Sequence, residues 1–346
     1  MRFDAILLAS FGGPEGQDDV MPFLRNVTRG RGIPDDRLEE VAHHYRVHGG
    51  VSPINQQNRE LKAALEAELD RRGLTLPVIW GNRNWDPYFS EALRQAHDEG
   101  HSRLLALVTS AYTSYSGVEQ YLEDFDGAMD ETGLRGSLEI SKVREYFDHP
   151  GFVTPFAEGV RQALATIEAE RSAARSHVLF VTHSIPTAAA EASGPEFGTG
   201  GAYVAQHLAT AEVVMRDAAP GLPWSLVYQS RSGSPHVPWL EPDVNDAIED
   251  LAAEGVEALV IVPLGFVSDH MEVLWDLDTE AMETATKHDM FALRVPTPGV
   301  HPTFVSGLVD LIVERLDDIP VEDRPHLTSL GPWPDLPAQG ALAERT

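Results

Sequence analysis

Short apolar runs rich in β-branched residues recur along the chain, and stretches with amphipathic helical spacing separate them. The clearest run, residues 259–262, is bounded by Pro263 and Gly265 and is much too short to cross a membrane. Runs of this kind are typical of strands buried on both faces of a parallel sheet. The pattern predicts strands at residues 3–10, 77–81, 103–110, 138–140, 176–182, 224–230, 258–262 and 291–296.

Helices are predicted between these strands. The amphipathic stretches cover residues 17–28, 35–47, 55–72, 118–130, 151–173, 202–217, 243–254 and 301–316, and further helices follow residues 86 and 269. Strict alternation of strand and helix implies βαβ units with right-handed crossovers and parallel sheets covered on both faces. The sequence therefore predicts an α/β protein of two doubly wound domains, four strands in each, with a cleft between them.

The helix after the strand at 258–262 carries carboxylates at a regular interval. Glu272, Asp276 and Glu280 recur every four residues and would share one helical face, with Ser268 as a plausible N-cap and Asp269 in the first turn. Two interpretations remain open. The carboxylates form a solvated acidic face, or they form a rail for a divalent cation at the mouth of the sheet.

Composition narrows the class of protein. The chain has 346 residues, 42% hydrophobic, with no apolar run long enough to span a membrane and no targeting pattern at its start, so we expect a soluble cytoplasmic protein. It contains no cysteine, which excludes disulfides, thiolate metal sites and Cys-ligated iron–sulfur clusters. The net charge of −28 argues against nucleic acid and anionic membranes as partners.

Ionisable groups follow two of the predicted strands in the second half. His183 comes directly after the strand at 176–182, and His270 and Glu272 follow the strand at 258–262. Ligands of open α/β sheets bind at this end of the strands. A histidine beside a carboxylate can accept a proton near neutral pH, or the two can coordinate a divalent first-row metal. For His183 taken alone, a histidine that merely caps a turn is an equally good interpretation.

Two other basic clusters have simpler interpretations. Arg29 and Arg31 lie in a glycine-containing loop that could grip carboxylates, although a solvated loop is favoured. His44 and His48 fall at a helix end before two glycines, where histidines commonly serve as partners of the helix dipole. We favour this structural role over metal binding.

Four sequence segments together resemble the ferrochelatase family. They are Thr-His-Ser-Ile-Pro at 182–186, Gly-Phe-Val-Ser-Asp-His-Met-Glu-Val-Leu-Trp-Asp at 265–276, Tyr-Gln-Ser at 228–230 with the Pro-Trp-Leu that follows at 238–240, and Gly-Gly-Val-Ser-Pro at 49–53. The resemblance runs from the first strand to about residue 316. It implies insertion of Fe²⁺ into a free-base porphyrin between two Rossmann-like domains, each built on a four-stranded parallel sheet.

The resemblance also implies roles for individual residues in the second half. His183 matches the family's active-site histidine and Glu272 its partner carboxylate. Asp276 and Glu280 match the remainder of an acidic helix face proposed as a metal route, so all four residues are candidate metal contacts. Which of His183 and Glu272 acts as base and which as metal ligand stays open at this stage.

Four residues of the first half are candidate substrate contacts by the same resemblance. Ser52, Tyr121 and Arg29 fall where related enzymes contact the porphyrin or its propionates. Phe11 stands where some bacterial relatives place an iron-ligating tyrosine. A phenyl ring cannot ligate iron, which leaves any axial ligand of the product undefined.

The expected domain organisation follows from the strand count and the resemblance. Residues 1–150, together with the C-terminal helix at 301–320, form the first Rossmann-like domain. Residues 151–300 form the second, which carries His183 and Glu272. The proline-rich segment 321–346 lacks periodicity and is expected to be an extended or disordered tail.

The substrate expected from the resemblance is coproporphyrin III, as in soluble bacterial members, because the chain has no apolar lip or anchoring extension. Fe²⁺ is then a substrate, with no permanently bound cofactor, no stable membrane insertion, and transient contacts with other enzymes of the haem pathway. Alternatives are a protoporphyrin IX ferrochelatase, a non-catalytic haem carrier, and a metal-dependent hydrolase. The hydrolase would need more metal ligands at neighbouring strand ends than the sequence provides.

Overall fold

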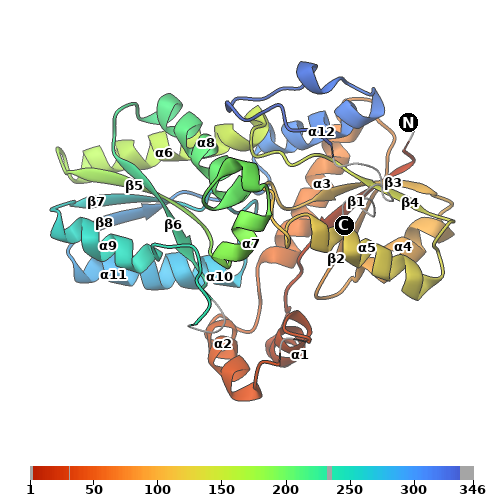
Figure 1. Ribbon diagram of the computed structural model, residues 1–346, viewed down its shortest axis with the longest axis horizontal. Helices are drawn as coiled ribbons and strands as arrows, with labels where there is room; N and C mark the ends of the chain where they lie inside the picture. The colour runs from red at the N-terminus through yellow and green to blue at the C-terminus, as the bar shows by residue number, and fades with distance from the viewer. Residues whose placement is uncertain (1–2, 31, 232–235, 336–346) are drawn as a thin grey trace.

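The computed structural model describes residues 3–30, 32–231 and 236–335 (Figure 1). Two four-stranded sheets, with strand orders β2-β1-β3-β4 and β6-β5-β7-β8, lie in the two halves of the chain, and every strand pair is parallel. The predicted α/β architecture with two parallel sheets is confirmed. Arg31, one of the two basic residues of the predicted loop, lies outside the described residues.

The strands occur where the apolar runs predicted them, with boundaries that differ by a few residues. The central strands β1 and β7 are buried along their whole length, which explains why their sequences are apolar throughout rather than alternating. The strands are β1 (Ala5–Ser10), β2 (Val78–Asn82), β3 (Arg103–Val108), β4 (Glu139–Lys142), β5 (Ser176–His183), β6 (Trp224–Gln229), β7 (Ala258–Val262) and β8 (Phe291–Arg294).

Helices cover both faces of each sheet, and α1 and α2 form a separate lobe beneath the two sheets (Figure 1). A short helix, α7, occupies part of a segment for which no helix was predicted, because its alanines and glycines have no amphipathic period. The main helices are α1 (Val20–Val27), α2 (Asp35–Val47), α3 (Ile54–Arg71), α4 (Phe89–Asp98), α5 (Glu119–Thr132), α6 (Pro150–Glu170), α7 (Thr187–Ala192), α8 (Gly201–Ala218), α9 (Val244–Ala253), α10 (Met271–Val273), α11 (Met282–Lys287) and α12 (Pro302–Leu316).

One hydrophobic core runs continuously through both domains. It contains Leu8 of β1 and Phe180 of β5 together with Phe304 of α12. The helix α12 packs against α3 of the first domain and α6 of the second. Because this side of the molecule is a shared core, it fixes the two sheets relative to each other. None of the described helices is long and apolar enough to cross a bilayer.

The segment after α12 is packed against the protein as far as the structure describes it. Apart from a 3₁₀ turn at Val321–Asp323 it has no regular element, yet Arg324 is buried and pairs with Asp335 at 2.6 Å. The Trp333 ring packs on Phe147 with 5.3 Å between centroids. Neither contact was foreseen, since the Arg324–Asp335 pair follows no regular period and the Trp333–Phe147 contact joins positions far apart in the chain. Residues 336–346 of the expected tail lie outside the described residues.

The acidic helix differs from the prediction in its start and in its winding. His270, not Ser268, is the N-cap, because the Asp269 carboxylate is bound to Arg294 and Thr297 instead of lying in the first turn. A single turn, α10, then continues as a π-helix over Leu274–Ala281 before α11 begins. π-Helical turns are rare and concentrate at functional sites, and residue periodicity does not distinguish them from α-helix.

Candidate active site

His183 and Glu272 meet at one edge of the second sheet. His183 is the last residue of β5, and Glu272 lies in α10, shortly after the neighbouring strand β7. The carboxyl ends of parallel strands lie on the same side of a sheet, so the two side chains are brought together. His183 Nε2 lies 3.3 Å from Glu272 Oε2.

Two hydrogen bonds set the orientation of the His183 imidazole, one made by its Nδ1 and one by the backbone carbonyl of His183. His183 Nδ1 hydrogen-bonds the carbonyl of Ser184, so it carries a proton and leaves Nε2 directed at Glu272. The Tyr203 hydroxyl donates to the backbone carbonyl of His183 at 2.9 Å. The ring is therefore held in one pose by a strand end and a buried tyrosine.

Electrostatics favours a charged pair at this position. Burial alone would disfavour the imidazolium, but the hydrogen bond and negative charge of Glu272 outweigh it, so the pKa of His183 lies above its usual value. Burial likewise opposes ionisation of Glu272, yet the hydrogen bond and positive charge of His183 lower the pKa of Glu272 to about 2. The side chains are 33% and 45% exposed, so cleft water screens this attraction and substrate can reach both groups.

Asp276 is held beside the pair by the end of β6. Its carboxylate accepts hydrogen bonds from the Ser230 hydroxyl and from Gln229 Nε2, the latter at 3.1 Å. Ser230 takes a left-handed backbone conformation, φ 58°, rare for a residue with a side chain. Burial, together with the charges of Glu272 and Glu280, raises the pKa of Asp276 to about 7 against the opposing Ser230 hydrogen bond. Asp276 can therefore exchange a proton near neutral pH.

Glu280, the last carboxylate of the row, is exposed and accepts a hydrogen bond from Trp275 Nε1 at 2.9 Å. The Trp275 indole in turn stacks on His44 of α2. The histidines near the end of α2 therefore do more than was expected of them. His48 does bond the carbonyl of His44 at the helix end, but His44 also contacts the acidic helix across the cleft.

The carboxylate row is not a preformed metal cage. In residues 3–30, 32–231 and 236–335, no three His, Asp or Glu side chains are grouped closely enough to hold a metal ion. Only His183 and Glu272 of the four candidate metal contacts are joined to each other, while Asp276 binds Ser230 and Glu280 binds Trp275.

The candidate contacts of the first domain are arranged in two groups. Phe11 follows β1, is 37% exposed and touches the Phe23 ring edge at 6.4 Å between centroids. Ser52 is buried, and a Cβ atom added at Gly13 would lie 2.7 Å from the Cβ atom of Ser52. Gly13 is therefore needed for close packing against Ser52. Of Phe11 and Ser52, only Phe11 is exposed.

Of the other two candidates, Arg29 borders a polar hollow of about 230 Å³, whereas Tyr121 does not. Tyr121 is itself buried beneath Arg83, whose guanidinium lies 3.8 Å from the ring centroid. The hollow is lined by Asn26, Val27, Arg29, Arg83, Asn84, Gln120 and Asp124.

Arg83 was missed by the sequence analysis. Its side chain is only 7% exposed, it pairs with Asp124, and its Nη2 has no protein partner. The neighbouring Asn84 Nδ2 is also buried without a partner. Unpaired buried donors are costly, so these two nitrogens are suited to bind an acceptor in the hollow, such as water or a carboxylate. The available signal was their position after β2, where polar residues point towards the crevice.

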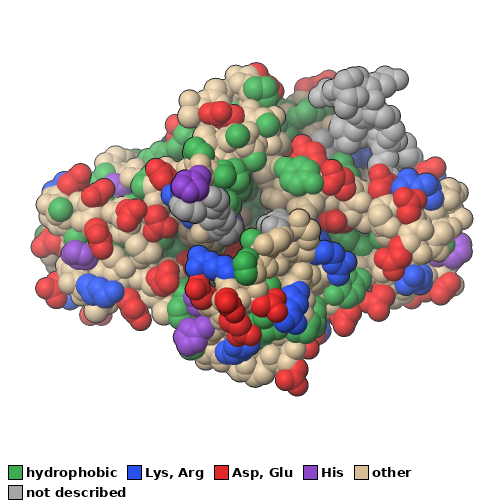
Figure 2. All heavy atoms as spheres, turned by 60° about the horizontal axis from the view of Figure 1, so that its bottom comes forward, with side chains coloured by type: hydrophobic (Ala, Val, Ile, Leu, Met, Phe, Trp, Pro, Cys, Tyr) green, Lys and Arg blue, Asp and Glu red, His purple; other side chains and the backbone are tan. Residues whose placement is uncertain are grey.

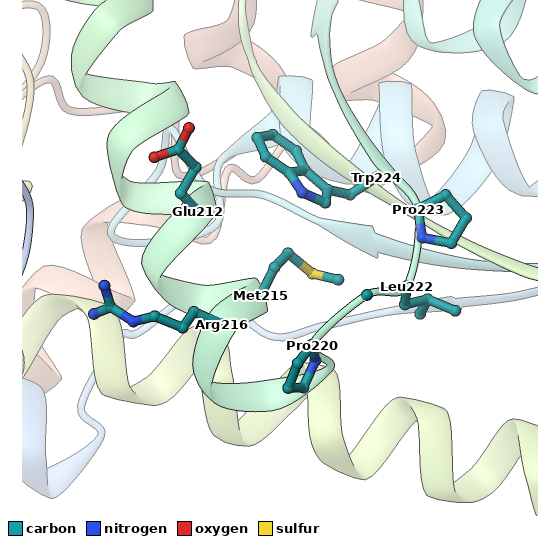
Figure 3. A pocket seen from close by; sticks show the side chains of 8 residues that line it. Glu212, Met215, Arg216, Pro220, Leu222, Pro223 and Trp224 are labelled. Carbon is teal, nitrogen blue, oxygen red and sulfur yellow. The ribbon is translucent and has the colours of Figure 1, made fainter.

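The surface is hollowed between the two halves of the molecule, above the lobe of α1 and α2 (Figure 2). A separate hollow of about 520 Å³ lies between the end of α8 and the start of β6 and is lined by residues that include Met215, Arg216 and Trp224 (Figure 3). The start of β6 is at the opposite end of the parallel sheet from His183. This second hollow therefore plays no part in the site.

Comparison with known proteins gives a consistent picture over nearly the whole chain. A family model described as Ferrochelatase matches residues 3–316. A protein of Leifsonia xyli named coproporphyrin III ferrochelatase is 61% identical, with 97% of this chain and 90% of the relative covered. A protein of the same name from Tropheryma whipplei is 55% identical, with 97% and 87% covered.

Among solved structures, the sirohydrochlorin chelatase SirB of Bacillus subtilis in complex with cobalt has a TM-score of 0.54. It is 12% identical, and the match covers 92% of this chain and 97% of SirB. At this level of identity the likeness concerns the fold alone, and it agrees with the paired parallel sheets described above.

Proposed function

The chain belongs to the ferrochelatase family, and we propose that it is a lyase that inserts Fe²⁺ into coproporphyrin III in haem biosynthesis. The observation that carries the proposal is the pair of His183 and Glu272, 3.3 Å apart at the open edge of the second sheet. The names of the relatives at 61% and 55% identity support the substrate.

The chemistry of the substrate suits the polar group in the first domain. Coproporphyrin III carries four propionates, whereas protoporphyrin IX carries two and replaces the others with apolar vinyl groups. Arg29 and the unpaired Nη2 of Arg83 border one hollow, and arginine is the preferred bidentate partner of a carboxylate. We assign this hollow to a propionate.

The reaction requires two protons to leave the porphyrin for each Fe²⁺ that enters. The nitrogen lone pairs lie in the ring plane, so a cleft that binds a bent macrocycle better than a flat one exposes them. His183 Nε2, when neutral, accepts a pyrrole proton and becomes an imidazolium that Glu272 stabilises. Asp276, whose pKa is raised to about 7 by burial, is suited to take a second proton.

The same two side chains can also contact iron. Nε2 of His183 and the carboxylate of Glu272 are a nitrogen and an oxygen donor suited to Fe²⁺ whenever no proton lies between them. Iron delivery and proton uptake therefore alternate at one place. Phe11 offers no donor atom, so it contributes packing against the ring and no axial ligand.

The setting of the reaction is part of the proposal. A net charge of −28 disfavours adsorption to anionic membranes, in keeping with action in the cytoplasm and with release of product by transient contact with the next enzyme of the pathway. No cofactor bound through cysteine is involved, because the chain has no cysteine.

A turnover assay separates this proposal from its alternatives. Catalytic amounts of protein are mixed anaerobically with Fe²⁺ and either coproporphyrin III or protoporphyrin IX, and absorption bands of the metallated ring are followed. Many turnovers with a higher kcat/KM for coproporphyrin III support the proposal. A higher value for protoporphyrin IX reassigns the substrate, and a colour change that stops at one equivalent indicates a carrier.

A further inference from the structure

Arg294 joins the two ends of the segment that carries the acidic residues of the site. The guanidinium of this last residue of β8 binds Asp269 through Nη1 and Nη2, at 3.1 and 3.3 Å. It also binds Asp278 through Nε and through Nη2, the latter at 3.0 Å. Asp269 lies just before the helix and Asp278 lies in the π-helix, so the two contacts bracket Glu272 and Asp276.

These contacts form a stiff connection. The Arg294 and Asp269 side chains are 15% and 18% exposed, so solvent competes little with this pair, whereas Asp278 is 37% exposed. A planar guanidinium that meets two carboxylates, each through two nitrogens, fixes their direction as well as their distance. The Thr297 hydroxyl adds a further hydrogen bond to Asp269 at 3.2 Å.

The helix is held from both edges of the sheet. In the order β6-β5-β7-β8, Arg294 ends the edge strand β8, while Gln229 ends the opposite edge strand β6 and is followed by Ser230. Asp276 is bound at the β6 side and Asp278 at the β8 side. His183, at the end of β5, lies between the two attachments.

The contacts of Arg294 with Asp269 and Asp278, here called the Arg294 tether, matter because the segment between the two carboxylates is partly π-helical. A π-helical turn is rarer than an α-helical one, and a return to α-helical bonding would rotate the residues before the π-helix relative to those after it. Fixing Asp269 and Asp278 to one group sets both the length and the rotation of the chain between them. Glu272 and Asp276 belong to that stretch.

We propose that Arg294 is a positioning residue that holds the segment between Asp269 and Asp278 in the rotation at which Glu272 meets His183. It touches neither group, and its effect is geometric. The inference rests on the proposed chelatase function for its kinetic consequence, while the effect on the helix itself can be measured without activity.

The test compares Arg294→Gln and Asp278→Asn with the unaltered protein. Because small misplacement of catalytic groups is costly, we expect kcat for iron insertion to fall roughly ten- to a hundredfold in Arg294→Gln. The Kd of coproporphyrin III should change less than about twofold, and Arg294→Lys, with one point charge, should recover only part of kcat. Amide exchange should accelerate within residues 271–281. Asp278→Asn, which keeps the contact to Asp269, should show the same changes to a smaller degree.

Arg72→Gln is the matched control. Arg72 also joins two carboxylates, Glu68 and Asp310, and is 20% exposed, but it connects α3 to α12. It should lower thermal stability without a specific loss of kcat. Folded Arg294→Gln protein with unchanged kcat, or unchanged exchange in 271–281, overturns the inference. An unaltered protein that lacks chelation but whose exchange responds to Arg294→Gln would reject the proposed function and keep the tether.

Discussion

The imidazole of His44 and the indole of Trp275 stack face to face, 4.0 Å apart and within 7° of parallel, although they belong to different domains. His44 lies on α2, in the lobe beneath the two sheets, and Trp275 lies in the π-helix of the second domain. Burial lowers the pKa of His44, against the charges of Glu280 and Glu272, so the ring stacks in its neutral form near pH 7. The stack therefore joins α2 to the π-helix.

Loss of this stack should weaken substrate retention. Aromatic pairs contribute about 0.5–1.5 kcal/mol beyond their burial, so His44→Ala should raise KM for the porphyrin roughly two- to tenfold with little change in kcat. Steady-state kinetics at saturating Fe²⁺ measures this. His97→Ala, an exposed histidine on α4, serves as control. A large fall in kcat with unchanged KM would show that the stack supports the chemistry instead.

Glu272→Gln should shift the pH dependence of turnover. A neutral His183 accepts protons, so the rate rises as pH increases through the His183 pKa, which burial opposes but Glu272 holds above its usual value. Without that carboxylate charge the His183 pKa falls, and the acidic limb of kcat/KM should move to lower pH. Turnover should also drop by about two to four decades. An acidic limb that stays in place would show that another group controls it.

Asp276→Asn should stabilise the protein at alkaline pH and not at acidic pH. Burial and the charges of Glu272 and Glu280 raise the Asp276 pKa from 3.8 to about 7. Between these values the folded state binds a proton that the unfolded state releases, so stability decreases as pH rises to about 7. Asparagine cannot ionise and avoids this loss. Thermal unfolding near pH 5 and near pH 8, with the exposed Asp246→Asn as control, measures the difference. Equal shifts at both pH values would contradict the raised pKa.

Arg83→Gln should weaken porphyrin binding. A hydrogen bond to a charged group contributes about 1.5–3 kcal/mol, so the Kd of coproporphyrin III should rise roughly ten- to a hundredfold. Fluorescence quenching of the porphyrin titrated with protein gives this value. Arg135→Gln, an exposed arginine paired with Asp130 beyond α5, should leave the Kd unchanged. If Arg83→Gln binds coproporphyrin III with the same Kd as the unaltered protein, the hollow beside Arg83 does not bind a propionate.

Much of the fold could be predicted because local sequence and tertiary environment agree. The apolar runs of β1 and β7 are strands buried on both faces, and His183 and Glu272 follow neighbouring strands, so their meeting could be expected from topology. Their chemical roles came from motif resemblance and remain proposals that the variants above test.

Other features depend on contacts that no local pattern encodes. Arg294 binds Asp269 and Asp278, which lie well before it in the chain and at or near the π-helix. Arg83 received no role from the sequence, and only its packing over Tyr121 places its unpaired Nη2 beside a hollow. In each case an arginine is given its role by partners that only the folded chain brings together.

The most direct test of the proposed function is single-turnover iron insertion by His183→Ala. We expect the variant to bind coproporphyrin III with a Kd within about twofold of the unaltered protein. Its rate of iron insertion should be slower by two or more decades, as loss of a proton acceptor requires. Insertion by His183→Ala at a near-normal rate would contradict the assignment of the His183–Glu272 pair as the catalytic centre.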